Sequence, residues 1–306
     1  MGETHRSSFS TAPVLNRQGE QQLDLLYSKD SIDRKILEAL GVHNNLTADD
    51  LHKLLGCDKT YLYRRLQVLT SLAYTRLSAE QLEEKNVSRK RTFFLAAIGA
   101  KWLKAHGKPI STRRTHRGYE SHANLTSAIT TDLYTGIMNT HDFRYVPSSE
   151  VRAHPHFHQP NDEPRNHPVI PHYKSKVIPD TDFFAIESAR GMRFLVIEAD
   201  NGTMTIRPTN PTTYKSATLY KKFEGYLPFI RDSVYNTKYG LPNFWVLFVF
   251  TDEARERATM ECLRAFNSSA ARYVLFQTIQ PGAQPGHLFT RPWLRVGHDP
   301  LLLNQP

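Results

Sequence analysis

The stretch VIPDTDFFAIESARGMRFLVIEADNGTM, residues 177–204, decides the fold of the C-terminal half of this chain. Its segments 176–187 and 193–198 are apolar enough to form the two strands of a hairpin. The segments that follow read as helix, strand, helix and strand at 212–239, 243–250, 252–266 and 272–278. This order predicts a mixed sheet with helices packed on it.

Acidic side chains fall at the ends of the predicted hairpin. Asp180 follows Pro179 on the first strand, and Glu198 and Asp200 end the second. We expect the three carboxylates to meet at one sheet edge and to bind Mg²⁺ or Mn²⁺, which could activate water for attack on a phosphodiester. The alternative is that they are ordinary strand-end acids. In either case we expect Gly202 to adopt a positive φ in the turn after the second strand.

This arrangement resembles the core of PD-(D/E)xK nucleases, with one departure. Asp200 stands where those enzymes usually have a lysine. Lys221 or Lys222, on the following helix, could supply the missing positive charge, although a solvated helix face explains both equally well. His122 is interpreted as a hydrogen-bonded residue at a helix start, with a catalytic role as the alternative. The proposed catalytic residues are Asp180, Glu198, Asp200, Lys221 and Lys222.

The N-terminal part has the pattern of a winged helix-turn-helix. Apolar residues at helical spacing, with Thr47 and Asp58 as N-caps, predict three short helices at 31–40, 46–55 and 58–72. Two strands at 74–77 and 92–96, joined by a charged turn at 81–91, would form the wing.

Basic and aromatic residues fall where a winged helix contacts DNA. Ten Lys or Arg and no acid lie from Lys85 to Arg117, which is expected of a phosphate-contacting surface and equally of a solvated linker with incidental charge. Dimerisation or protein contact is the alternative use of such a module. The residues expected to contact double-stranded DNA, on the third helix and the wing, are Lys59, Tyr61, Tyr63, Arg64, Arg65, Arg89, Lys90 and Arg91.

Composition and length set the remaining expectations. The chain has 306 residues, a net charge of +9 and two cysteines, without a signal peptide or an apolar membrane-spanning run. We therefore expect a cytoplasmic protein that needs no membrane and, lacking a phosphate-binding GxxxxGK[ST] loop, no nucleotide cofactor. The predicted parts are a flexible segment (1–29), a winged helix (30–106), a basic and Pro/His-rich connection containing a helix (107–171) and a nuclease-like domain (172–300).

Four segments together resemble the replication-relaxation family of bacterial plasmids and integrated mobile elements. They are HANLTSAITTDLY from His122, VIPDTDFF from Val177, FLVIEADNGTM from Phe194 and YKKFEGYLPF from Tyr220. Asn201 stands where the family usually has Arg.

The family's members join a winged helix to a restriction-endonuclease-like domain, so the resemblance implies an α+β protein with a winged helix-turn-helix followed by a mixed-sheet, restriction-endonuclease-like α/β domain. Two functions remain open. The first is a metal-dependent DNA phosphodiesterase in replication or transfer. The second is a non-catalytic DNA-binding factor, in replication, transfer or transcription, whose nuclease-like fold is a binding or homodimerisation platform.

Overall fold

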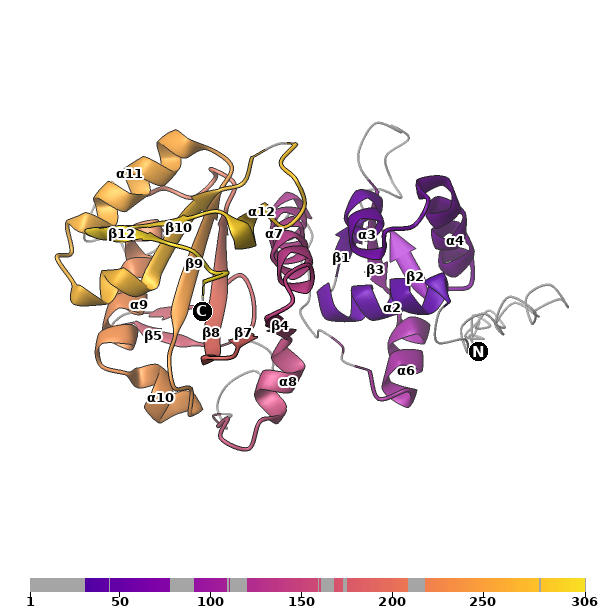
Figure 1. The fold of residues 1–306 in the computed structure, drawn as a ribbon, viewed down its shortest axis with the longest axis horizontal. Coiled ribbons are helices and arrows are strands. Elements are labelled where there is room, and N and C mark those ends of the chain that lie inside the picture. Colours follow the sequence, from indigo (N-terminus) through magenta and orange to yellow (C-terminus); the bar gives the residue numbers. More distant parts are fainter. Residues whose placement is uncertain are drawn as a thin grey trace, which may run out of the picture.

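The computed structural model describes residues 31–43, 45–77, 91–108, 110, 120–158, 160, 168–172, 175–208, 218–280 and 282–305. Figure 1 shows a small N-terminal part beside a larger sheet domain, with one helix, α7, between them. No helix in these ranges is long and apolar enough to cross a lipid bilayer.

The N-terminal part is a winged helix. Its helices are α2 (Ile32–His43), α3 (Ala48–Leu55) and α4 (Lys59–Ser71), followed after the wing by α6 (Ala97–Ala105). Its three-stranded sheet has the order β1-β3-β2, with β1 (Asn45–Thr47), β2 (Thr75–Leu77) and β3 (Thr92–Leu95). The wing tip, residues 78–90, lies outside the described residues.

The second helix begins two residues later than the sequence predicts. Residues 45–47 are extended and pair with β3, so that Leu46 belongs to β1. Thr47 is the N-cap of α3, because its side chain accepts a hydrogen bond from the Asp50 amide while the Asp50 carboxylate accepts one from the Thr47 amide. The cap is where the sequence places it, and it ends the extended segment.

A seven-stranded mixed sheet forms the C-terminal part. Its order is β12-β11-β10-β9-β8-β7-β4, in which β8, β9 and β10 are parallel and the other pairs antiparallel. The strands are β4 (Phe143–Val146), β7 (Phe184–Ser188), β8 (Gly191–Asp200), β9 (Trp245–Phe250), β10 (Val274–Thr278), β11 (Trp293–Arg295) and β12 (His298–Leu301).

Helices cover both faces of this sheet. One face packs against α9 (Leu219–Arg231) and α11 (Glu253–Arg264), and the other against α7 (Glu120–Met138) and α12 (His287–Thr290). The structure confirms the predicted fold class, an α+β protein with a winged helix-turn-helix followed by a mixed-sheet domain. Smaller elements are α8 (Ser148–Ala153), β5 (Ile170–His172), β6 (Ser175–Val177), α10 (Val234–Tyr239) and a 3-10 helix (Ser269–Tyr273).

The first strand of the predicted hairpin is interrupted. β6 ends at Val177 and β7 begins at Phe184, so Asp180 lies in the connection between two strands and not on one strand. The connection is nevertheless fixed to β8. The Asp180 amide donates to the Ile197 carbonyl at 3.1 Å, and the Ile197 amide donates to Thr181 Oγ1 at 2.8 Å.

The long helix predicted at 212–239 is two helices. Residues 209–217 lie outside the described residues, Thr218 is the N-cap of α9, and α10 follows after a break. Ser233, between the two helices, has a φ of 51°, a left-handed conformation that ends α-helical geometry. Amphipathic periodicity continues across this break, which is why the sequence alone does not reveal it.

Helix α7 belongs to both parts of the molecule. Its residues Ile129, Leu133 and Ile137 are fully buried against the sheet. The opposite side contacts β1, α2 and α3 of the winged helix. Both α7 and β4 come from residues 107–171, the segment expected to connect the two domains.

Candidate functional site

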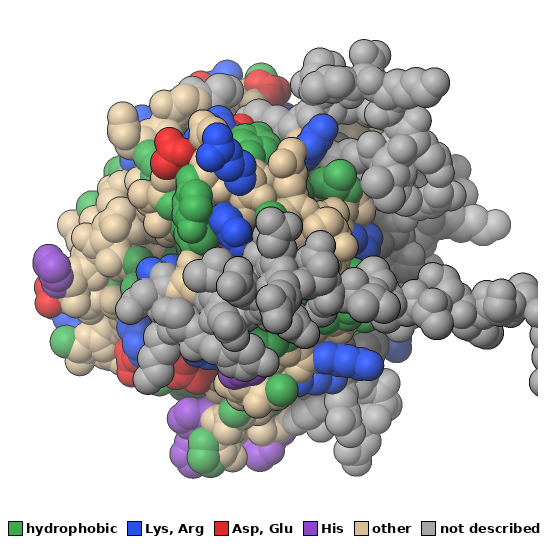
Figure 2. Space-filling view, turned by 90° about the vertical axis from the view of Figure 1, so that its right-hand side faces the viewer, with side chains coloured by type: hydrophobic (Ala, Val, Ile, Leu, Met, Phe, Trp, Pro, Cys, Tyr) green, Lys and Arg blue, Asp and Glu red, His purple; other side chains and the backbone are tan. Residues whose placement is uncertain are grey.

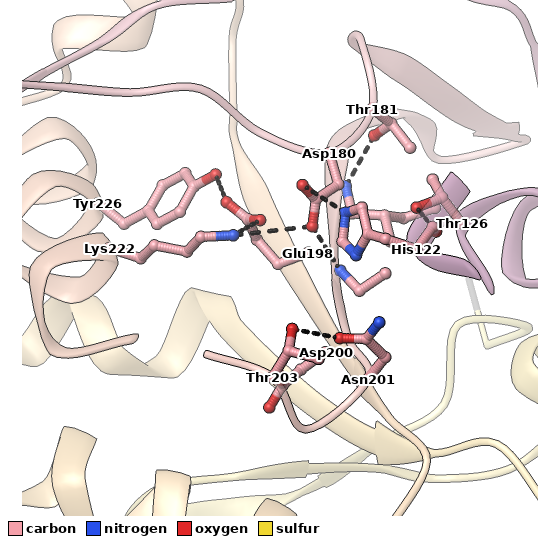
Figure 3. A network of polar contacts seen from close by, with 12 residues as sticks. His122, Thr126, Asp180, Thr181, Glu198, Asp200, Asn201, Thr203, Lys222 and Tyr226 are labelled. Carbon is pink, nitrogen blue, oxygen red and sulfur yellow. Dashed lines mark hydrogen bonds and ion pairs between the residues drawn. The ribbon is translucent and has the colours of Figure 1, made fainter. Parts of the chain in front are cut away.

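Two carboxylates and one ammonium group meet near the C-terminal end of β8 (Figure 3). The Nζ atom of Lys222 contacts Glu198 Oε2 and lies 3.7 Å from Asp180 Oδ2. The hydroxyl of Tyr226 donates to Glu198 Oε1. His122 Nε2 lies 3.0 Å from Asp180 Oδ1. We call Asp180, Glu198 and Lys222 the central triad.

Three elements position the triad. Glu198 is on β8 with only 1% of its side chain exposed, and Lys222 and Tyr226 are one turn apart on the same face of α9. Asp180 is held by β8, because the Ala199 amide donates to its Oδ2 at 2.9 Å. The fold therefore brings together residues from segments that are well separated in sequence.

Gly225 allows the Asp180 segment to approach α9. A Cβ at this position would lie 2.8 Å from Val177 Cγ2, which is too close for an ordinary contact. Val177 ends β6, three residues before Asp180. The glycine of the KKFEGY segment thus lets the strand that leads to Asp180 pack directly on the helix that carries Lys222.

Asp200 lies outside this triad. It shares the face of β8 that carries Glu198, but the Arg255 guanidinium of α11 binds its carboxylate through Nε and, at 3.1 Å, through Nη2. Arg255 also donates to the Met204 carbonyl, and the Gly202 amide donates to Asp200 Oδ1 at 3.1 Å. Gly202 has the positive φ that the sequence predicts, 86°. Asp200 therefore fixes the turn after β8.

The two lysines expected near the acids are placed differently. Lys222 reaches both carboxylates of the triad, while Lys221, one residue earlier, is rotated by about 100° around the helix. A further acid, Asp182, is bound by Arg152 of α8 through two hydrogen bonds of 2.8 and 2.6 Å. Asp180 and Glu198 thus share Lys222, whereas Asp182 and Asp200 are each bound by an arginine from another element.

Burial and neighbouring charges shift the pKa values of the two triad carboxylates in opposite directions. Burial alone would raise the pKa of Asp180, but the charge of Lys222 and the hydrogen bond from His122 outweigh burial and hold this pKa far below its usual range. Burial, reinforced by the Asp180 charge, raises the pKa of Glu198 to about 8. For Lys222, burial lowers the pKa but the two carboxylates raise it more. Glu198 therefore takes up a proton at a higher pH than an ordinary carboxylate, whereas Asp180 stays ionised beside Lys222.

The donor set restricts which metal site is possible. Among the described residues, no group of three His, Cys, Asp or Glu side chains is placed to hold a metal ion. Asp180 and Glu198 are the remaining pair of carboxylates, and the ammonium of Lys222 lies between them, so a divalent ion would have to take the place of that ammonium. The carboxylate of Asp200, the third acid expected at this site, is bound by the Arg255 guanidinium.

The residues predicted to contact DNA differ in their exposure. Lys59, Tyr61 and Arg64 are exposed on α4, although Lys59 pairs with Asp49 at 2.5 Å. Tyr63 is partly buried against the winged-helix core. Arg91 is exposed immediately before β3, whereas Arg89 and Lys90 lie outside the described residues.

Arg65 requires a correction. It does not lie on the outward face, because its guanidinium forms two hydrogen bonds with Asp33 of α2. The Arg65 side chain is 12% exposed and that of Asp33 2% exposed, so the pair lies between two helices. One residue of helical rotation separates exposed Arg64 from structural Arg65.

Comparison with known proteins assigns the chain to a family. The sequence model of the replication-relaxation family matches residues 37–243, which is more than half of the chain. The chain belongs to the replication-relaxation family. Membership indicates a replication-related role. No curated protein and no solved structure matches the chain.

The family match covers both candidate sites of this replication-relaxation protein. It begins in α2 of the winged helix and ends just before β9, so it includes the central triad, His122 and Tyr226. Arg255, which binds Asp200, lies beyond the match.

Sequence reasoning missed three contacts of this replication-relaxation protein. The sequence indicates a helix start at His122 and gives no site contact for Tyr226 or Arg255. The spacing of Lys222 and Tyr226, four residues apart on a helix, is a signal that both face the same site. No local signal points to Arg255, which is 55 residues from Asp200.

Proposed function

We propose that this replication-relaxation protein binds double-stranded DNA of a plasmid or integrated mobile element through its winged helix. The observation that carries the proposal is the division of α4, where Leu62, Leu66 and Leu69 are buried while Lys59 and Arg64 project outward. An exposed basic face on such a helix suits the major groove. Figure 2 views this end of the molecule and shows Lys and Arg side chains at several points on it.

Substitution of one exposed arginine tests this proposal. Arg64→Ala should weaken binding to duplex DNA by about tenfold at physiological salt, the effect of losing one base or phosphate contact. Arg257→Ala is the matched control, because Arg257 is an exposed arginine on α11 of the sheet domain, outside the winged helix. Fluorescence anisotropy with labelled duplex measures both. Equal affinities for the two variants would contradict the assignment of α4 as the DNA-contacting helix.

A second candidate function is a metal-dependent DNA phosphodiesterase, and the central triad is the observation that favours it. The lysine that Asp200 replaces in the sequence is supplied from α9 by Lys222, so two carboxylates and an amine still converge. Asp180 and Glu198 would hold Mg²⁺ or Mn²⁺, which when bound would supply an activated water and positive charge. Lys222 would balance negative charge that develops on a phosphate.

A cleavage assay separates this enzyme from a non-catalytic DNA-binding platform. Supercoiled, linear and branched DNA are each incubated with Mg²⁺, Mn²⁺ or a chelator. The enzyme hypothesis expects metal-dependent products that Asp180→Asn and Lys222→Met both abolish, and a metal-induced rise in melting temperature that Asp180→Asn removes. If the DNA stays intact and melting is indifferent to both metals, the platform function remains.

A further inference from the structure

The first turn of α7 contacts the winged helix and the central triad at the same time. Asn124 Oδ1 accepts hydrogen bonds from Asn45 Nδ2 and from Thr92 Oγ1, each at 3.2 Å. Two residues earlier, His122 contacts Asp180. Two nearby side chains of α7 therefore contact the winged helix and the central triad, which are far apart in the sequence.

The winged-helix partners of Asn124 are the strands that support the wing. Thr92 is the first residue of β3, the strand that leaves the wing, and Asn45 is the first residue of β1. β1 and β3 are paired, with Thr47 opposite Thr92. Asn45 and Thr92 are 4% and 0% exposed, so a movement of the base of the wing reaches Asn124 through buried hydrogen bonds.

His122 holds one of the two oxygens of Asp180. Its Nε2 contacts Oδ1, whereas Oδ2 is held by the Ala199 amide of β8 and lies 3.7 Å from Lys222. The backbone of His122 is itself held within the helix, because Thr126 Oγ1 donates to its carbonyl at 2.9 Å. A shift of this turn would therefore move Oδ1 of Asp180, whereas Oδ2 is held separately by β8.

We propose that the first turn of α7 couples the winged helix to the central triad, with Asn124 receiving the movement and His122 acting as the positioning residue for Asp180. This inference rests on the proposed function, because DNA binding is the event that would move the wing. Duplex DNA can shift the equilibrium between two arrangements of the α7 contacts only by the difference in its affinity for them. Coupling is reciprocal, so a ligand on the triad alters the affinity for duplex by the same factor.

A purely structural role for Asn124 would hold the two domains together without affecting the triad. The distinguishing readout is therefore local to Asp180. In the full-length protein we follow the ring nitrogen signals of His122 and the hydrogen exchange of the Asp180 amide, which donates to Ile197. Thr92→Val removes one donor to Asn124 from the winged-helix side. Thr70→Val is the matched control, because Thr70 hydrogen-bonds to Leu66 and Thr75 inside the winged helix.

The coupling predicts a shifted His122 signal and exchange at the Asp180 amide about fivefold faster in Thr92→Val, the factor expected from loss of one hydrogen bond. Thr70→Val should leave both at the parent value. His122→Leu should also accelerate exchange at Asp180, and His122→Gln, whose amide nitrogen replaces Nε2, should restore it. A His122 signal that Thr92→Val does not move, or that Thr70→Val moves equally, overturns the coupling.

Addition of duplex DNA supplies the second arm. In the parent, saturating duplex should shift the His122 signal, and Asn124→Ala should bind the same duplex without that shift. A shift that persists in Asn124→Ala overturns the role of Asn124. Binding is followed in parallel by anisotropy, so absence of duplex binding would contradict the proposed function, whereas the Thr92→Val result still decides the coupling.

Discussion

Arg64 and Arg65 are adjacent in the sequence, yet only Arg64 lies on the exposed face of α4. Arg65 neutralises Asp33, which is almost fully buried in α2. Two neighbouring arginines thus have different roles: Arg64 is exposed and available to DNA, whereas Arg65 stabilises the fold by pairing with Asp33. A basic residue in a predicted recognition helix needs its exposure known before it is assigned to DNA.

Arg65→Ala is predicted to destabilise the winged helix by about 3 kcal/mol, because it leaves the Asp33 carboxylate buried and without its partner. Urea denaturation followed by circular dichroism measures the change. Replacing both partners, Arg65→Met with Asp33→Leu, should recover much of the loss. An Arg65→Ala variant as stable as the parent would show that the pair contributes nothing.

Glu198 is predicted to make stability fall as pH rises. Burial raises its pKa from 4.5 in the unfolded chain to about 8. The folded state therefore keeps a proton that the unfolded chain releases, so its contribution is complete below about pH 4.5 and is lost by about pH 8. The free energy of unfolding of the parent, minus that of Glu198→Gln, should decrease across this window. A difference that rises with pH would refute the raised pKa.

Helix α9 shows how one element assembles the candidate site. Lys222 and Tyr226 face the carboxylates, Gly225 between them faces Val177, and Phe223 packs into the core below the sheet. The same short segment of α9 thus contacts both Glu198 of β8 and Val177 of β6. Val177, which packs on Gly225, ends β6 three residues before Asp180.

Gly225→Ala is predicted to destabilise the protein by about 1 kcal/mol, although alanine favours helices by about the same amount. The added Cβ would lie 2.8 Å from Val177 Cγ2 and push β6 away from α9. Thermal denaturation of Gly225→Ala, Val177→Ala and the double variant forms a cycle in which Val177→Ala relieves the clash. If Gly225→Ala melts above the parent, the close approach is not required.

At the scale of the whole molecule, α7 makes the two domains interdependent. Beyond Asn124, His43 Nδ1 of α2 lies 3.3 Å from Thr130 Oγ1, and the His43 ring packs edge-on against Tyr134. The opposite face of α7 is buried in the sheet domain. The winged helix is therefore docked on a helix that the sheet needs for its own core.

His43 is predicted to make this docking sensitive to acid. Burial lowers its pKa from 6.5 to about 4, so the unfolded chain takes up a proton before the folded state does. The contribution to stability is present above about pH 6.5 and is lost as pH falls toward about 4. Unfolding free energies of the parent should fall more steeply than those of His43→Phe over this range. Parallel pH profiles would contradict the prediction.

The sequence by itself determines the elements and the chemistry available. Helical periodicity and the capping residues Thr47 and Asp58 give the three winged-helix helices, and the apolar strands and acids of residues 177–204 give the sheet domain and its candidate site. These signals are visible because they depend on hydrogen bonds and side-chain spacing within a few residues. They also give the family, which the match over residues 37–243 confirms.

Tertiary structure alone decides which of these residues meet. The edge strands β4 and β12, and β11 beside β12, carry little local signal. Only packing places Arg255 at Asp200, Lys222 between Asp180 and Glu198, and His122 of α7 at Asp180. These partners come from different elements, and a buried charge must find an opposite charge or hydrogen bond wherever the fold places one. The physical reason is that each pairing depends on how α7, α9 and α11 pack on the sheet, which no spacing along the chain records.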